Sequence, residues 1–180
     1  STDRAVEFSR ELSLSDVDSS VAESVRRRVL DTLAASTAGY RMPGIDVTRD
    51  YALDTHDGDE APLLDGSGRR LSVAGATLAN ATAANTLDID DGHREVKGHP
   101  AAVVVPAALT AGAATDATVG EFLDAVYVGY ELAVRAGLAI HATDGVYTGT
   151  GSWGAVGAAA AVARCQGLSR AETALALGTT

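Results

Sequence analysis

Residues 85–106 read NTLDIDDGHREVKGHPAAVVVP, and this polar stretch separates two alanine-rich, apolar parts of the chain. Within twelve residues it carries three aspartates and two histidines, Asp88, Asp90, Asp91, His93 and His99. Gly92 and Gly98 interrupt the stretch, and each glycine costs a helix about 1 kcal/mol relative to alanine. The pattern therefore predicts a polar loop held between two packed segments, which is a common setting for an active site.

The composition favours helices packed around a core of small side chains. The chain has 180 residues, enough for one sizeable core or two small ones. Hydrophobic residues make up 46% of it but aromatic residues only 4%, so the core has to consist mainly of alanine, valine and leucine. Small side chains let helix backbones approach one another closely.

The net charge of −10 excludes two classes of partner. Nucleic acids and anionic membrane surfaces both require a basic face. We recognise no signal peptide, and charges and glycines break every apolar window too often for a membrane span. Cys165 is the only cysteine, which excludes an intrachain disulfide and favours a reducing compartment. We therefore expect a cytoplasmic protein.

Apolar residues recur at helical spacing along most of the chain, which predicts an all-α fold. The expected helices cover residues 3–12, 20–39, 74–86, 106–114, 118–142 and 153–166, and a last one runs from Ser169 to Thr180 without a stop signal. Capping boxes mark three of the starts, at Ser20–Glu23, Thr118–Glu121 and Ser169–Glu172. Periodicity does not distinguish helix from strand just before Pro106, but that proline fits a first helical turn.

Residues 42–72 form the least regular region and are expected to be a small irregular excursion from the helical domain. Pro43, Gly44, the pair Asp57-Gly58 and the run Gly66-Ser-Gly68 all argue against a helix there. The segments 61–64 and 69–73 flank the turn at 65–68 and predict a short hairpin.

A metal site is one alternative for the acidic loop. An EF-hand needs acids at positions one, three and five, glycine at six and a carboxylate at twelve. Counted from Asp88, Gly92 falls at five and His99 at twelve. The spacing of His93 and His99 also matches no common zinc motif. We therefore expect no metal here.

A glycine-rich loop at 144–152 precedes the expected helix at 153–166. Its segment Gly149-Thr-Gly-Ser-Trp-Gly154 leads into a helix N-terminus, where backbone N–H groups favour anions. The segment is neither a P-loop nor a dinucleotide-binding turn. It predicts either an anchor for a substrate carboxylate or a tight loop whose glycines serve packing, and both interpretations remain open.

Acid–base chemistry is the third alternative for the polar loop. A histidine beside a carboxylate can transfer protons near neutral pH, and Asp88 and His99 are the candidates. Lys97, the only lysine, or an arginine could bind a substrate carboxylate. A merely solvated charged loop would have the same residues, and spacing alone does not choose between the two.

The same residues resemble the MmgE/PrpD family, which includes 2-methylcitrate dehydratase, cis-aconitate decarboxylase and iminodisuccinate epimerase. The resemblance rests on Asn80, followed by Asn85-Thr-Leu-Asp-Ile-Asp-Asp91, Gly98-His-Pro100 and an apolar helix. Three further stretches agree in the expected order, at 28–39, 129–135 and 151–161. The resemblance extends along essentially the whole chain.

This resemblance implies that residues 1–180 are an N-terminal helical domain, with a C-terminal α/β lid domain that is absent from this chain. Such proteins form homodimers, and an apolar helical half should also retain exposed faces for a second copy. Their reactions are cofactor-free proton transfers beside a carboxylate of a small di- or tricarboxylic acid. The resemblance therefore implies a lyase or isomerase, similar to 2-methylcitrate dehydratase, that uses no cofactor and no metal.

Carried over residue by residue, the resemblance makes His99 the acid–base group or a ligand of the substrate carboxylate. Asp88 matches the aspartate that supports the site. The expected substrate-binding residues are Asp91, Gly92, His93, Lys97, Tyr147 and Thr148.

This chain departs from the family pattern at several positions. Gly92 replaces the threonine after the paired aspartates, Asn85 replaces a histidine, and Thr148 replaces the histidine of the second loop. The catalytic lysine is expected downstream of Thr180, and Lys97 is not its equivalent. These departures support an alternative, in which the chain is a catalytically incomplete helical domain or the partner subunit of a split enzyme.

Overall fold

The computed structural model describes residues 2–143 and 147–180, and within these ranges helices dominate, as the sequence predicts. The elements are α1 (Thr2–Glu11), the 3-10 helix η1 (Leu14–Asp16), α2 (Ser19–Gly39), α3 (Ile45–Thr55), β1 (Ala61–Pro62), β2 (Arg70–Leu71), α4 (Val73–Asn85), α5 (Pro100–Ala114), α6 (Val119–Thr143), α7 (Thr150–Cys165) and α8 (Arg170–Gly178). None of the described helices combines the length and apolar composition that a membrane span requires.

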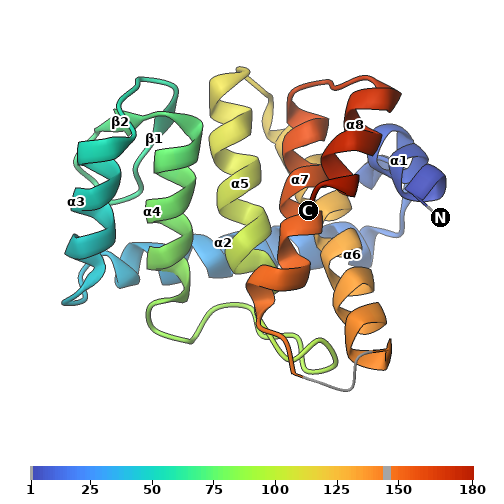
Figure 1. Cartoon of the computed structure of the whole chain (residues 1–180), viewed down its shortest axis with the longest axis horizontal. Helices are drawn as coiled ribbons and strands as arrows, with labels where there is room; N and C mark the ends of the chain where they lie inside the picture. Colours follow the sequence, from blue (N-terminus) through green and yellow to red (C-terminus); the bar gives the residue numbers. More distant parts are fainter. Residues whose placement is uncertain (1, 144–146) are drawn as a thin grey trace.

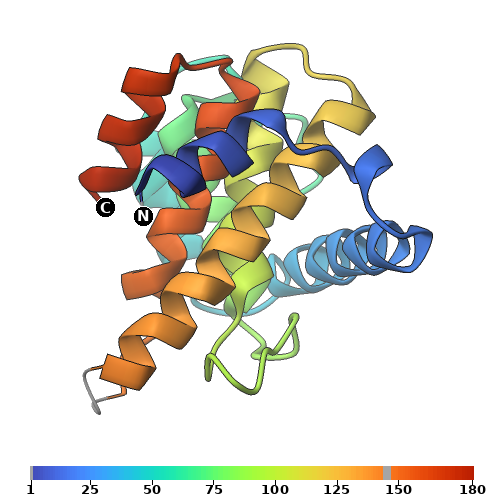
Figure 2. The same ribbon diagram turned by 90° about the vertical axis from the view of Figure 1, so that its right-hand side faces the viewer.

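The helices form a row that is crossed by α2. Helices α3, α4, α5 and α7 stand side by side in Figure 1, while α2 runs across them and contacts α4, α5 and α6. Beside α7, at the end of the row away from α3, α1 packs on α8, α7 and α6 (Figure 2). The last residues of α4 and α6 and the first residues of α5 and α7 all lie along the lower edge of the row in Figure 1.

The excursion at 42–72 contains the predicted hairpin but also a helix that we did not expect. Strands β1 and β2 pair antiparallel, with Ala61 opposite Leu71 and Pro62 opposite Arg70. The prediction that this region lacks helix was wrong, because Pro43 and Gly44 precede α3 instead of interrupting it. Gly44 takes a φ of 101° at the N-cap, and Ile45 and Ala52 are buried on the inner face of α3.

Two apolar helices begin earlier than their patterns predict. Helix α5 starts at Pro100, where the missing N–H of proline costs no helical hydrogen bond, and Pro106 lies inside it. An internal proline normally disrupts a helix, but α4, α6 and α7 all pack against α5. Helix α7 starts at Thr150 and not at Trp153.

The capping predictions had mixed outcomes. Thr118 with Glu121 and Ser169 with Glu172 form the expected reciprocal hydrogen bonds. The prediction of a capping box at Ser20–Glu23 was wrong, because α2 already begins at Ser19, after Asp18, and no side chain caps its N-terminus. The last helix does not continue to Thr180 but ends at Gly178.

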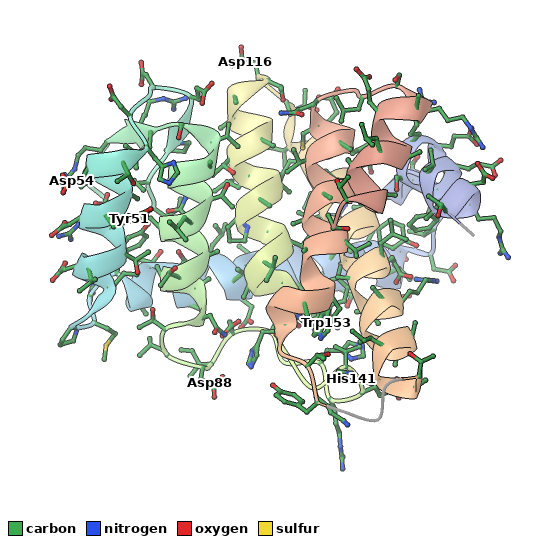
Figure 3. The ribbon with its side chains drawn as sticks, viewed as in Figure 1. Tyr51, Asp54, Asp88, Asp116, His141 and Trp153 are labelled. Atoms are coloured by element: carbon green, nitrogen blue, oxygen red, sulfur yellow. The ribbon has the colours of Figure 1, made fainter. Side chains whose placement is uncertain are left out.

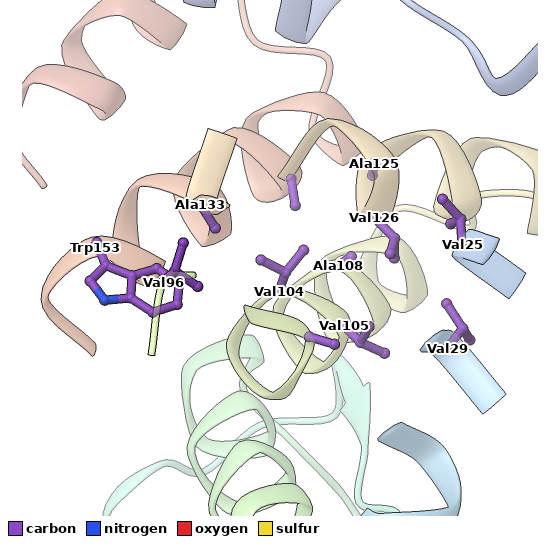
Figure 4. Close-up of a cluster of buried hydrophobic side chains, with 12 residues drawn as sticks. Val25, Val29, Val96, Val104, Val105, Ala108, Ala125, Val126, Ala133 and Trp153 are labelled. Carbon is purple, nitrogen blue, oxygen red and sulfur yellow. The ribbon is translucent and has the colours of Figure 1, made fainter. Parts of the chain in front are cut away.

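The main core consists of small side chains, as the composition predicts, with one large ring at one end. Trp153 lies beside Val96 at one end of it, and Val104, Val105, Ala108, Ala125 and Val126 continue it toward α2 (Figure 4). Trp153 is 1% exposed and heads the fully buried side chains by size. It joins the start of α7 to the polar loop, because Val96 belongs to that loop.

Helices α6 and α7 cross in direct contact at two glycines. A Cβ atom on Gly129 would lie 2.7 Å from the carbonyl oxygen of Gly157 and 2.7 Å from Cγ1 of Val104. Neither neighbour is the free end of a flexible chain, so any side chain at Gly129 would separate α6 from α7.

We therefore expect Gly129→Ala to lower the free energy of unfolding by about 1–3 kcal/mol through overpacking. Gly120→Ala in the same helix is the matched control, because its nearest neighbour atom would be 3.9 Å away. The control should change stability by less than about 1 kcal/mol. Urea denaturation measures both, and equal effects would contradict the close packing.

Candidate active site

The polar loop lies where α4 ends and α5 begins, along the same lower edge of the row as the start of α7. Asp88, Trp153 and His141 mark this edge in Figure 3. The loop turns through two residues with positive φ, Asp88 at 54° and Lys97 at 53°, and residues 93 and 98 form an isolated antiparallel bridge. This small closed turn brings His99 back to the N-cap of α5.

His99 is held between two aspartates. Its Nε2 lies 3.0 Å from Oδ1 of Asp88, and its Nδ1 lies 3.3 Å from Oδ2 of Asp90. The same Nδ1 is 3.0 Å from the backbone carbonyl oxygen of Asp90. The backbone N–H of His99 donates to Oγ1 of Thr150 at 3.0 Å, which ties the ring to the start of α7.

The two aspartates differ sharply in burial. The Asp88 side chain is 83% exposed, whereas that of Asp90 has no exposed surface. Asn85 donates from Nδ2 to both carboxylate oxygens of Asp90, at 3.2 and 3.3 Å. Burial raises the pKa of the Asp90 carboxyl above its ordinary value of 3.8, although His99 and the hydrogen bonds oppose that shift. Asp90 is therefore the fixed partner of the ring.

A hollow of about 420 Å³ opens directly beside His99. Its wall is formed by Ala81, Thr82, Asn85 and Thr86 of α4, His99, Ala102 and Val103 at the start of α5, and Thr150 and Gly151 of α7. No side chain caps α5 or α7 at its N-terminus. Free N–H groups of a first helical turn attract anions, and here two such turns border one hollow.

A second hollow of about 330 Å³ lies on the other side of the loop. It is lined by Gly92, His93, Arg94, Lys97, Gly98 and His99. His99 thus borders both hollows, and the second one brings together Gly92, His93 and Lys97, which the sequence predicts to bind substrate.

Asp91 points away from His99. Its Oδ2 accepts a hydrogen bond of 2.8 Å from the Tyr130 hydroxyl, and its Oδ1 lies 3.5 Å from Nε of Arg28. Burial, and secondarily the Asp91 charge, raise the pKa of the Tyr130 phenol. The predicted substrate-binding role of Asp91 stays a prediction, because the hollow that Asp91 borders with Arg27, Arg28 and Asp31 does not include His99.

Tyr147 and Thr148 lie on the neighbouring link, of which residues 144–146 are outside the described part. Nε2 of His141 lies 3.3 Å from both the carbonyl oxygen and the hydroxyl of Thr148. The Tyr147 ring stacks on His141 with centroids 6.2 Å apart and is 65% exposed. Neither residue lines the hollow beside His99, so their predicted contact with substrate also remains a prediction.

The residues that hold His99 in place were not expected from the sequence. Asp90 and Thr150 contact His99 and Asn85 holds Asp90, yet only Asp88 and His99 were singled out for catalysis. One signal was present, because consecutive side chains of an extended segment point in opposite directions. Within the described ranges, no group of three or more His, Cys, Asp or Glu side chains is placed to hold a metal ion.

We expect the charge of Asp90 to cost stability. Its raised pKa means that the folded protein holds this proton more tightly than the unfolded chain, so the carboxyl stabilises the fold fully below pH 3.8. That contribution is lost as the pH rises through the raised value. Relative to Asp90→Asn, the wild-type free energy of unfolding should fall as the pH rises above 3.8 and through the raised pKa of Asp90. Urea denaturation measures it, and a rising difference would contradict the assigned burial cost.

The chain is similar to known proteins along most of its length. A family model described as the MmgE/PrpD N-terminal domain matches residues 3–180. A cis-aconitate decarboxylase-like protein of Aspergillus oryzae is 29% identical over 178 residues, covering 93% of this chain and 37% of that protein. A cis-aconitate decarboxylase of Aspergillus terreus is 26% identical over 148 residues, covering 79% of this chain and 30% of that protein.

The chain spans about a third of the length of these curated relatives. The family match, by contrast, covers all but the first two residues of the chain, including the loop, both hollows and every helix described above. The chain belongs to the MmgE/PrpD family, and it corresponds to the N-terminal domain of that family.

Proposed function

We propose that the protein is a lyase or isomerase that moves a proton beside a carboxylate of a small di- or tricarboxylic acid. His99 is the acid–base group, and no cofactor takes part. The observation that carries this proposal is the position of the imidazole, which borders two hollows while a buried aspartate holds its Nδ1.

The proton moves through Nε2 of His99. Because Nδ1 faces the carbonyl and carboxylate oxygens of Asp90, the ring keeps one orientation and a proton on Nδ1 is favoured. Nε2 is then free to exchange a proton with the substrate once the substrate displaces Asp88. The Asp90 charge also stabilises the imidazolium that forms when Nε2 accepts a proton from carbon. In a dehydration or an epimerisation, the same imidazolium returns the proton to the leaving hydroxyl or to the carbanion. In a decarboxylation the carbanion forms by loss of CO2, and an imidazolium that is already protonated at Nε2 donates that proton to it.

Asp88 has a different part in this proposal. It contacts Nε2 from an exposed and positive-φ position, so an incoming substrate can displace it without uncovering a buried charge. Asp88 therefore supports the ring in the empty site and orients the substrate or a water molecule in the occupied one.

The electrostatics of the two hollows fit a substrate with more than one carboxylate. The first turns of α5 and α7 offer backbone N–H groups to one carboxylate, together with the Thr150 hydroxyl. Arg94 and Lys97 offer positive charge on the other side of His99. The chain as a whole carries a net charge of −10, which repels a negatively charged substrate. The local donors and cations offset this repulsion at the site.

Cis-aconitate is the first substrate to test, since the relatives that match this chain are described as cis-aconitate decarboxylases or as similar to one. 2-Methylcitrate and iminodisuccinate are the other two, because dehydration and epimerisation need the same proton transfer. The full-length protein should be assayed with all three.

We expect His99→Gln in the full-length protein to lower kcat by about 10²–10⁴-fold on the accepted substrate, because it removes the general acid–base group. His56→Gln is the matched control, since His56 caps the distant end of α3. The control should keep wild-type turnover. A His99→Gln protein that retains full kcat would refute the proposed role of His99.

A further inference from the structure

Three side chains from distant parts of the sequence meet behind the catalytic loop. Tyr130 of α6 donates its hydroxyl hydrogen to Asp91 at 2.8 Å, and Arg28 of α2 lies 3.5 Å from the other oxygen of the same carboxylate. The Arg28 guanidinium also lies over the Tyr130 ring, 5.0 Å from its centroid. The Asp91 side chain is only 11% exposed, whereas that of Arg28 is 34% exposed, so the carboxylate is mostly buried and the guanidinium reaches the surface.

The position of Asp91 in the chain gives this cluster its importance. The carbonyl oxygen that faces Nδ1 of His99, at 3.0 Å, belongs to the peptide bond between Asp90 and Asp91. A peptide group is planar, so its carbonyl can turn only by rotation about the bonds to the flanking Cα atoms. Tyr130 and Arg28 hold the Asp91 side chain, and they therefore restrict the rotation of the carbonyl that faces His99.

The two neighbouring aspartates are held in opposite directions. Asp90 turns inward to Asn85 and His99, while Asp91 turns toward α2 and α6. Without a partner for Asp91, both carboxylates would compete for the same cation, which is His99 when it is protonated. Arg28 supplies a separate cation for Asp91, and this leaves His99 paired with Asp90 and Asp88 alone.

We propose that Arg28 and Tyr130 are positioning residues of the catalytic centre. Their contacts hold Asp91 in place, and through the peptide group between residues 90 and 91 they keep the carbonyl and carboxylate oxygens of Asp90 against Nδ1 of His99. These oxygens keep the His99 imidazole in its Nδ1–H tautomer. Neither residue touches the substrate. This inference rests on the proposed role of His99, but its first test requires no substrate.

Tyr130→Phe is the sharpest test, because it removes one hydroxyl and keeps the ring under Arg28 and beside His93. In the full-length protein labelled with 15N-histidine, the ring-nitrogen shifts report the tautomer, and His99→Gln identifies the His99 signals. We expect His99 to be in the Nδ1–H tautomer in the wild type and in a mixture of tautomers in Tyr130→Phe.

Tyr40→Phe is a matched control. The Tyr40 hydroxyl also makes a sheltered hydrogen bond, of 2.7 Å, to Oδ1 of Asn80, and burial likewise raises the pKa of its phenol. Tyr40 contacts the α3 and hairpin side of the domain, away from His99. Thermal unfolding should show comparable losses for the two variants, while only Tyr130→Phe changes the tautomer. Arg28→Gln is a second variant that should repeat the effect by removing the cation.

The tautomer measurement decides the proposal by itself. A wild-type tautomer ratio in both Tyr130→Phe and Arg28→Gln would overturn it, and so would an equal change in Tyr40→Phe. With a substrate in hand, kcat of Tyr130→Phe should fall about tenfold while KM stays close to wild type. If His99→Gln kept full turnover, the proposed function would fail. The tautomer result would still show whether Arg28 and Tyr130 orient the ring.

Discussion

The contact between the buried Asp90 carboxylate and the His99 ring is the constraint on which the site depends. Asp90 has no exposed surface, and burial raises its pKa, so the fold gives up stability to keep this carboxylate inside. Such a cost persists in a protein when the group serves a purpose other than folding. Here the purpose is to hold an imidazole at the N-cap of α5, between two hollows.

The small-residue core is what lets the parts of this site meet. Glycines at the crossing of α6 and α7, and alanines and valines along α5, allow those helices to approach backbone to backbone. Close approach brings the uncapped starts of α5 and α7 to the same hollow. Gly98 has a similar role in the loop, since a Cβ there would lie 2.4 Å from Oγ1 of Thr150 and 2.8 Å from the Trp153 ring. An alanine at this position would push the loop off the start of α7.

Much of the fold could be predicted from the sequence, because helical periodicity and capping boxes are local signals. The hairpin and the helices α1, α4, α6 and α8 were expected close to where they occur. Helix α3 was missed because Gly44 was read as a breaker, although in the structure it starts the helix at a positive φ. The early start of α5 was missed because its own sequence shows no helical periodicity before Pro106. The packing of α4, α6 and α7 against α5 stabilises the helix in spite of that internal proline.

The candidate site was predictable in position but not in its internal roles. The density of polar residues between two apolar segments located it, and His99 and Asp88 do meet at 3.0 Å. Asp90 turns toward His99, whereas Asp91 turns toward Arg28 and Tyr130, which lie 63 and 39 residues from Asp91 in the sequence. Contacts over such separations follow from helix packing, and no spacing rule within the loop contains them.

A crystal structure of the full-length protein with cis-aconitate bound tests the central claim most directly. We predict one carboxylate within hydrogen-bonding distance of the first turn of α5 or α7, and a substrate carbon beside Nε2 of His99. Asp90 should still contact Nδ1 in that complex. A substrate bound elsewhere, with the hollow beside His99 empty, would contradict this account of the site.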